Sequence, residues 1–330
     1  MKQKQMKQSR NIVALSGGVG GAKLALGLSK VLAPDELTIV TNTGDDFCHM
    51  GFPVSPDLDT VMYTLAGLNN TELGWGLKNE SWQFMDALEV LGGETWFRLG
   101  DRDIATHTYR REKIAAGLNL QQLTEQLCLA LNVQHRLIPM SNDSVATQVF
   151  DGSDWLDFQD YFVRRQCAPT VTGIRFNGIE QAALSEGFEQ ALAAVSEIES
   201  DTGNALKAVL ICPSNPFVSV DPILKLPTVL PKLKQCSAPV IAVSPIVNGQ
   251  AIKGPTAKMM AALDMPVSAL GVANYYRDII DGLVIDHADA DAVSEIEALG
   301  IRVKMANSIM ISEQGKIALA NDCISFAEQF

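Results

Sequence analysis

Residues 11–23 read NIVALSGGVGGAK, an apolar run followed at once by a glycine cluster. The apolar run predicts a buried strand over Asn11–Ser16, and the spacing of Leu24, Leu28 and Val31 predicts an amphipathic helix after the glycines. Glycines let the backbone turn sharply between the two elements and approach a bound group closely. This stretch therefore predicts the strand–turn–helix unit of an α/β protein.

Five further runs rich in β-branched residues alternate with stretches of helical periodicity. They are Leu37–Asn42, Leu137–Met140, Ala208–Cys212, Pro239–Ser244 and Leu283–Asp286. Several are apolar at every position, which is typical of strands that helices cover on both faces, so we expect a mostly parallel sheet. The segment from Phe150 to Ile179 instead predicts an antiparallel hairpin.

The domain organisation is only weakly marked. We expect a nucleotide-binding core formed by residues 11–140 and 208–330, an inserted α+β segment over residues 141–207, and a flexible tail over residues 1–10. The tail is rich in Lys and Gln, and the short apolar run after it is unlike a secretion signal.

Composition excludes several classes of protein. The chain has 330 residues and a net charge of −12, which argues against binding nucleic acid through its phosphates. No run approaches the ~18 apolar residues of a membrane span. The six cysteines are scattered without a C-x-x-C pair, a usage typical of a reducing compartment. We therefore expect a cytoplasmic protein that binds neither nucleic acid nor membrane.

The glycine cluster after the first strand is a candidate phosphate-binding loop. Free N–H groups at the start of a helix face a bound anion favourably. The spacing matches neither the G-x-x-x-x-G-K-[ST] loop nor a clean dinucleotide fingerprint. A tight turn without a ligand is the alternative.

Four carboxylates follow closely. Asp45 and Asp46 come directly after the second predicted strand, and Asp57 and Asp59 lie in the first turn of a helix that Ser55 should cap. Acidic residues in a first turn also suit the helix dipole by themselves. Together, however, four carboxylates would repel each other beside a phosphate site, so the residues favour a Mg²⁺ ion among them.

Two later stretches carry further candidates. Arg98 and Arg102 flank Gly100, as guanidinium groups that grip a phosphate or carboxylate would. Asp101 as a helix N-cap is the structural alternative there, and Gly117 should end that helix. Asn215 follows another apolar strand in a proline-fixed loop, where its amide could read a base or sugar.

Six motifs, taken in order along the chain, resemble the 2-phospho-L-lactate transferase family. They are Gly17–Lys23, Asn42–Asp46, Ser55–Leu65, Leu99–His107, Pro213–Pro216 and Ser244–Ile246. The resemblance implies a Rossmann-like, Mg²⁺-dependent, homodimeric enzyme of coenzyme F(420) biosynthesis. Such an enzyme moves a phospholactyl-type group from a guanosine diphosphate adduct to 8-hydroxy-5-deazariboflavin and releases GMP.

The resemblance also implies roles for individual residues. Asp59 and Arg98 correspond to positions that contact the deazaflavin, and Asp45 with Asp59 corresponds to the metal pair. The positions beside the diphosphate are Gly17, Gly18, Gly20, Gly21 and Lys23, and Asn215 lies near the guanosine. The catalytic residues implied are Asp59, Asp45 and Lys23.

Several alternatives stay open. The first loop resembles bacterial members of the family more than archaeal ones, so the group carried by the donor could derive from 2-phospholactate, phosphoenolpyruvate or phosphoglycerate. The general base is unassigned. A non-catalytic regulator that senses nucleotide sugars is the main alternative, and a NAD-dependent dehydrogenase is a distant third. Arg98 and the Gly-Asp-Arg-Asp segment favour the enzyme, because a sensor would not need them.

Overall fold

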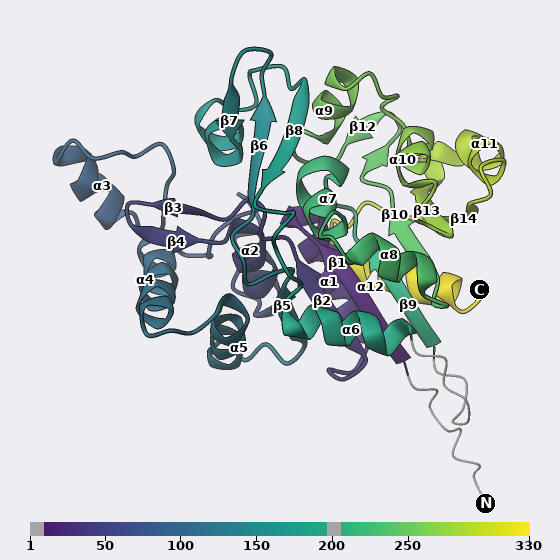
Figure 1. Cartoon of the computed structure of the whole chain (residues 1–330), viewed down its shortest axis with the longest axis horizontal. Coiled ribbons are helices and arrows are strands. Elements are labelled where there is room, and N and C mark those ends of the chain that lie inside the picture. Colours follow the sequence, from purple (N-terminus) through teal and green to yellow (C-terminus); the bar gives the residue numbers. More distant parts are fainter. Residues whose placement is uncertain (1–9, 197–205) are drawn as a thin grey trace, which may run out of the picture.

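The computed structural model describes residues 10–196 and 206–330 (Figure 1). Within them, seven strands form one parallel sheet in the order β14-β13-β10-β9-β1-β2-β5. Their bounds are β1 (Arg10–Ser16), β2 (Leu37–Thr41), β5 (Arg136–Pro139), β9 (Leu206–Ile211), β10 (Val240–Val243), β13 (Gly282–Asp286) and β14 (Arg302–Ala306). The structure confirms all six predicted strands and adds β14.

Helices cover both faces of this sheet. Successive side chains of a strand point to opposite faces, so each strand contributes to both apolar layers. Ile12 and Ala14 of β1 belong to one apolar cluster, and Val13 and Leu15 belong to the other. The first cluster includes side chains of α1 (Gly18–Val31), α2 (Pro56–Leu65), α5 (Leu120–Ala130) and α12 (Glu313–Ala327). The α/β, Rossmann-like fold predicted from the sequence is therefore confirmed.

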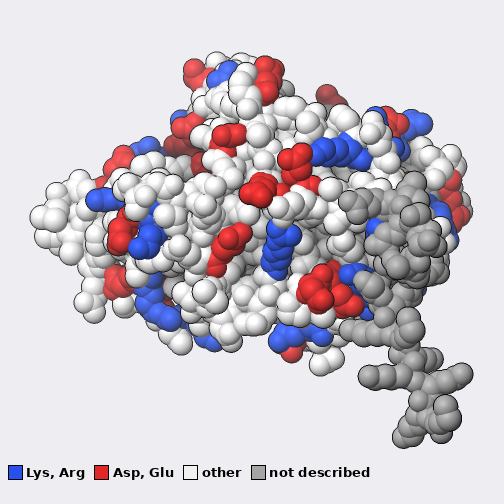
Figure 2. Space-filling model, turned by 60° about the horizontal axis from the view of Figure 1, so that its bottom comes forward, with Lys and Arg blue, Asp and Glu red and all other residues white. Residues whose placement is uncertain are grey.

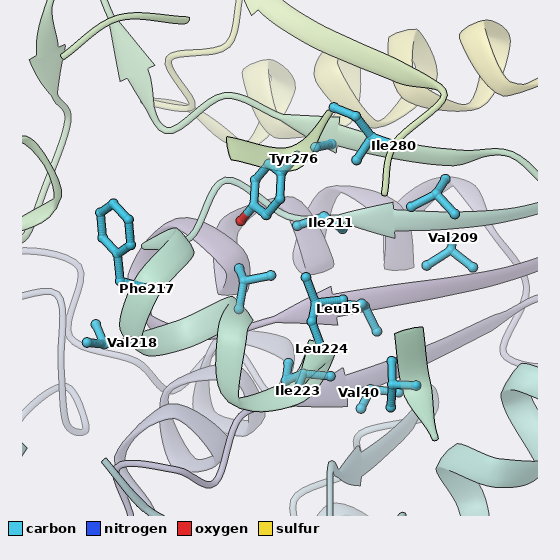
Figure 3. Close-up of a cluster of buried hydrophobic side chains, with 14 of the residues drawn as sticks. Leu15, Val40, Val209, Ile211, Phe217, Val218, Ile223, Leu224, Tyr276 and Ile280 are labelled. Atoms are coloured by element: carbon cyan, nitrogen blue, oxygen red, sulfur yellow. The ribbon is translucent and has the colours of Figure 1, made fainter. Parts of the chain in front are cut away.

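The second cluster lies under helices from later in the chain. They are α6 (Glu186–Ser196), α7 (Asp221–Leu224), α8 (Val229–Gln235), α9 (Thr256–Ala262), α10 (Ala269–Tyr276) and α11 (Val293–Glu297). Figure 3 shows part of it, with Leu15 and Val40 of the sheet beside Ile223 and Leu224 of α7. Each of these side chains is at most 1% exposed, so the sheet is rigidly held between the two layers.

Smaller elements extend beyond the sheet. β6 (Ala146–Phe150), β7 (Trp155–Asp157) and β8 (Gly173–Asn177) form an antiparallel sheet, which confirms the predicted hairpin, with a π-helical turn at Asp160–Arg164. Two further antiparallel pairs are β3 (Phe47–His49) with β4 (Phe52–Val54), and β11 (Ile246–Val247) with β12 (Gln250–Ala251). α3 (Gln83–Val90) and α4 (Asp101–Ala115) lie at the periphery (Figure 1).

The expected domain boundaries remain predictions. α6 belongs by sequence to the proposed insertion, yet it packs on β1, β5 and β9 of the main sheet. Residues 1–9 of the proposed tail lie outside the described residues, and Arg10 already begins β1. In the described part of the chain no helix is long and apolar enough to cross a membrane. Acidic and basic side chains are interspersed on the face that Figure 2 shows.

The strand order locates the place where a ligand belongs. From β1 the chain moves outward to β2 and β5, and it then returns to the other side of β1 with β9. Order reverses between β1 and β9, and open α/β sheets bind ligands outside the carboxyl ends of strands at such a point. Here those ends lead into Gly17 and into the loop at Pro213–Asn215.

Candidate functional site

A cavity of about 610 Å³ opens at this reversal point. Its lining includes eight of the residues singled out from the sequence: Gly17, Gly18, Gly20, Lys23, Asp45, Asp57, Arg98 and Asn215. Four others, Gly21, Asp46, Asp59 and Arg102, are not part of the lining. The structure therefore gathers most of these candidates around one cavity, and their functional roles stay predictions.

The glycine loop forms one wall and touches the loop after β9. Ser214 Oγ donates to Gly17 O at 2.6 Å and accepts from Gly17 N at 3.2 Å. A Cβ atom on Gly20 would collide with the carbonyl oxygen of Pro213, and one on Gly21 would lie 2.7 Å from Ser214 Oγ. The glycines are required here because two backbones meet. Gly21 serves this contact rather than the cavity.

The start of α1 borders the cavity, because Gly18, Val19 and Gly20 belong to its lining. Gly18 has φ +62°, a conformation that glycine adopts without strain. The helix runs 14 residues from Gly18 to Val31 without an acidic residue in its first turn. The carboxylate of Asp57 already contacts the first residue of this helix, so a bound anion would share the partial positive charge of the helix start with Asp57.

Two carboxylates meet at one amide group on the same wall. Asn42 Nδ2 donates to Asp45 Oδ1 and to Asp57 Oδ2, each at 3.0 Å. Asp57 also accepts a hydrogen bond from the backbone of Gly18, which puts it at the start of α1. Both carboxylates line the cavity. The structure thus brings Asp45 together with Asp57.

Burial shifts the titration of this pair. Loss of hydration raises the pKa of Asp57 to about 6. The pKa of Asp45 lies well above its ordinary value, because of burial first and then of the charges on Asp57 and Asp46. Among the described residues, no lysine or arginine lies within 4.0 Å of either carboxylate. The described residues therefore give this pair hydrogen bonds but no ion pair with a lysine or arginine.

The chemistry of this pair fits a hard cation. Mg²⁺ characteristically binds one or two carboxylates and completes its shell with water and substrate phosphates. Within residues 10–196 and 206–330 no group of three or more His, Cys, Asp or Glu could hold a metal ion. An ion at Asp45 and Asp57 would therefore need oxygen atoms from a bound phosphate or from water.

Asp59 faces a different partner. Its carboxylate accepts from Arg110 Nη1 at 3.1 Å and pairs also with Arg110 Nη2, and His107 Nδ1 lies 3.9 Å away. Residues two positions apart on a helix point in different directions, so Asp57 reaches the cavity while Asp59 is turned toward α4. The metal and deazaflavin roles expected of Asp59 remain predictions without a direct cavity contact.

Ser55 occupies the N-cap of α2 as predicted, but its hydroxyl group serves another residue. Ser55 Oγ donates to Asp46 Oδ2 at 2.7 Å and makes no capping hydrogen bond. Burial raises the pKa of Asp46 well above its ordinary value, and the hydrogen bond from Ser55 partly opposes that shift. Asp46 is therefore held behind the pair that lines the cavity.

Three cationic side chains line the cavity: Lys23, Arg98 and Lys253. Burial lowers the pKa of Lys23, and the nearby charges of Lys253 and Lys316 lower it further. The guanidinium carbon of Arg98 lies 4.5 Å from the ring centre of Trp82, a distance that suits a cation–π contact. Lys253 was not singled out from the sequence as a ligand-binding residue, because it belongs to no recognisable motif.

Aromatic side chains form another part of the lining: Trp75, Trp96, Phe97, Phe158 and Phe162. Phe158 and Phe162 stack with ring centres 5.4 Å apart and planes 5° apart. A flat apolar ligand gains both buried area and ring contacts on such a surface. The cavity therefore combines an anion-binding wall with an aromatic wall.

Asn215 lines the cavity but is partly used by its own loop. Its Oδ1 accepts from Phe217 N at 2.9 Å and from Val218 N at 3.4 Å, so it caps the turn at Pro216–Val220. Its Nδ2 lies 3.4 Å from Met259 Sδ, a weak acceptor. Contact with a guanosine, as expected from the sequence, would have to use this amide nitrogen.

The fold and cavity define an α/β protein with a glycine-rich loop at the reversal point of a parallel sheet. The chain belongs to the family described as 2-phospho-L-lactate transferase CofD, whose family model matches residues 12–314. This family consists of transferases of coenzyme F(420) biosynthesis.

Relatives of this chain carry two different names. It is 40% identical to a phosphoenolpyruvate transferase of Kitasatospora aureofaciens over 96% of this chain and 98% of the relative. It is 36% identical to a 2-phospho-L-lactate transferase of Methanosarcina acetivorans over 94% of this chain and 96% of the relative. Both relatives match over nearly their full lengths.

A solved structure resembles the fold. A member of the upf0052 family from Bacillus halodurans superposes with a TM-score of 0.55 and 14% sequence identity, covering 91% of this chain and 93% of that one. At this level of identity the likeness concerns the fold alone.

Proposed function

We propose that the protein transfers a three-carbon phosphate group from a guanosine diphosphate adduct to 8-hydroxy-5-deazariboflavin and releases GMP. The observation that carries the proposal is one cavity in which the start of α1, Lys23 and the Asp45–Asp57 pair share space with an aromatic lining and Arg98. A diphosphate suits the first group of features. A flat deazaflavin suits the second.

The proposed reaction is a displacement at phosphorus. The terminal ribityl hydroxyl group attacks the phosphorus next to the three-carbon group. The new phosphorus–oxygen bond forms as the phosphoanhydride bond breaks, the electron pair leaves with GMP, and the hydroxyl proton is released. Positioning and charge neutralisation supply most of the acceleration in such reactions.

The residues divide this work. N–H groups at the start of α1 and the ammonium group of Lys23 hold the diphosphate and neutralise charge on the leaving GMP. Asp45 and Asp57 would hold Mg²⁺, which neutralises phosphate charge when it is bound. Arg98 and the aromatic side chains orient the acceptor so that its hydroxyl group lies in line with the phosphorus. No general base is assigned, since a metal ligand is a poor base.

The names of the relatives reduce the number of candidates for the three-carbon group on the donor. Their names favour a phosphoenolpyruvyl or 2-phospholactyl group, and a phosphoglyceryl group is the third candidate. We further propose that the enzyme works as a cytoplasmic homodimer, a proposal that sedimentation of the purified protein would test.

Binding of the acceptor tests the proposal against the sensor alternative. We expect the purified protein to shift or quench deazaflavin fluorescence, and saturating Mg²⁺–GDP should still permit this binding because the two ligands occupy adjacent parts of the cavity. Failure to bind deazaflavin with or without Mg²⁺–GDP, together with tight binding of a UDP-sugar, would contradict the transferase proposal.

Two arginines allow a matched comparison in an assay of the transfer reaction. Arg98 lines the cavity, whereas Arg102 Nη1 donates to the backbone oxygen of Lys78 at 2.9 Å and is not part of the lining. Arg98→Ala should mainly raise the KM for deazaflavin, and Arg102→Ala should leave it near the unmutated value. A selective rise in the KM for the donor would instead move Arg98 to the phosphates.

A further inference from the structure

Lys253 is an exposed lysine that lines the cavity and comes from a distant part of the chain. It lies between β12 and α9, more than 200 residues after the glycine loop, and lines the same cavity as Lys23. Its charge contributes to lowering the pKa of Lys23, after the larger effect of burial. The two ammonium groups are therefore close enough to repel each other.

Gly74 lies beside the ammonium group of Lys253. A Cβ atom on Gly74 would be 2.5 Å from Lys253 Nζ and 3.7 Å from Val19 Cγ2. Because Val19 belongs to the first turn of α1, this one point places the ammonium group beside the start of that helix. Gly74 has φ +83°, so both the space and the backbone conformation depend on glycine.

The loop that carries Gly74 is ordered by its own hydrogen bonds. Gly74 N donates to Asn70 O at 2.9 Å, Asn70 N donates to Gly76 O at 3.0 Å, and Leu73 N donates to Asn70 Oδ1 at 3.0 Å. Leu73, Gly74 and Trp75 all line the cavity. This turn is a preformed wall against which the Lys253 side chain rests.

The described residues provide no ion-pair partner for the two lysines of the cavity. In the described part of the chain no carboxylate lies within 4.0 Å of Lys23 Nζ or Lys253 Nζ. Two mutually repelling ammonium groups beside a helix start are stabilised by an anion that contacts both. A ligand with two phosphoryl groups can do so because it offers several anionic oxygen atoms.

We infer that Lys253 is a further phosphate-binding residue, which contacts the donor diphosphate together with Lys23 and neutralises charge on the leaving nucleotide. This inference rests on the proposed transferase function for its catalytic part. Its binding part requires only that a diphosphate occupies the cavity. Gly74 is a positioning residue, because it acts through the space it leaves for Lys253.

Lys316 supplies a matched control. It also lowers the pKa of Lys23 through its charge, but it belongs to α12 and is not part of the cavity lining. Replacing Lys316 removes a nearby positive charge without removing a cavity contact. Replacing Lys253 by Met should remove both, and replacing it by Arg should restore the charge.

The test is calorimetric titration with Mg²⁺–GDP and, separately, with Mg²⁺–pyrophosphate. We expect Lys253→Met to weaken both ligands about tenfold or more, as loss of a hydrogen bond to a charged group does. Lys253→Arg should retain most of the affinity, and Lys316→Met should stay within about twofold of the unmutated protein. In the transfer assay Lys253→Met should also lower kcat, because the leaving phosphate gains charge during the reaction.

A second variant tests the contact with Gly74. Gly74→Ala should weaken both ligands, and its effect should largely vanish in the Lys253→Met background, since both changes act on one ammonium group. Equal effects of Lys253→Met and Lys316→Met would overturn the inference, and so would additive effects of Gly74→Ala and Lys253→Met. If the unmutated protein binds pyrophosphate but does not bind GDP, the guanosine assignment is wrong, and the pyrophosphate titrations alone decide the role of Lys253. If it binds neither ligand, both proposals are wrong.

Discussion

Arg110 of α4 pairs with Asp59 of α2 through both terminal nitrogens of its guanidinium group. Arg110 is 1% exposed and Asp59 is 5% exposed, so the pair is buried. It lies behind Asp57, which is two residues earlier on the same helix and lines the cavity. The ion pair therefore holds the helix that positions a site carboxylate.

Loss of Arg110 should destabilise the fold. Arg110→Met leaves Asp59 as an uncompensated buried charge, and breaking a buried pair in this way typically costs about 3–5 kcal/mol of unfolding free energy. Urea denaturation would measure the change. Arg111→Met is the control, because the neighbouring Arg111 is exposed and lies 5.8 Å from the Phe52 ring centre. A loss below ~1 kcal/mol for Arg110→Met would show that the pair does not hold α2.

The raised pKa of Asp57 should make the stability of the fold depend on pH. Its pKa is raised from 3.8 to about 6 by burial, so the folded protein disfavours the charged carboxylate. The stability that this shift contributes is present in full below pH ~4 and is lost as the pH rises through 6. Without Mg²⁺, Asp57→Asn should thus be more stable than the unmutated protein at pH 8, by on the order of 1–3 kcal/mol.

Lowering the pH and adding Mg²⁺ should each change the difference in stability between the unmutated protein and Asp57→Asn. The difference in unfolding free energy should shrink as the pH falls toward 4, where Asp57 is protonated in both states. Adding Mg²⁺ at pH 8 should stabilise the unmutated protein more than Asp57→Asn, since only the former retains both carboxylates. An equal response to Mg²⁺ in the two proteins would remove Asp57 from the proposed metal pair.

Gly20 should tolerate no side chain. In Gly20→Ala the new methyl group would collide with Pro213 O, and forcing the loops apart should cost about 1–3 kcal/mol of stability. The affinity for Mg²⁺–GDP should fall as well. Gly315→Ala is the matched control in α12, because its Cβ would meet nothing closer than Ser312 Oγ at 3.5 Å. Denaturation curves and titrations that coincide for the two variants would contradict the close approach at Gly20.

The main sheet could be predicted because its inner strands are apolar at nearly every position. β13 is buried at all five positions, and β1 is buried at its last five. β14 escaped prediction because it carries Arg302 and Lys304, and four of its five positions are exposed or partly exposed. A strand of this composition lacks the continuous apolar pattern of its neighbours.

The candidate site could be predicted only in outline. The sequence places Asp57 and Asp59 together in the first turn of α2, and which of them faces the cavity depends on the packing of α2 against α4. Lys253 and Gly74 meet only because two loops, far apart in the chain, fold over the start of α1. Such long-range contacts leave no periodic or motif signal in one sequence.

The central claim is that this protein transfers a three-carbon phosphate group to a deazaflavin. Mass spectrometry of the products made by the purified protein from 8-hydroxy-5-deazariboflavin, Mg²⁺ and each candidate guanosine diphosphate adduct tests it most directly. We predict one adduct to be used well above the others, yielding GMP and a deazaflavin heavier by the corresponding phosphate group. Unchanged deazaflavin with all three adducts, from protein that binds them, would contradict the claim.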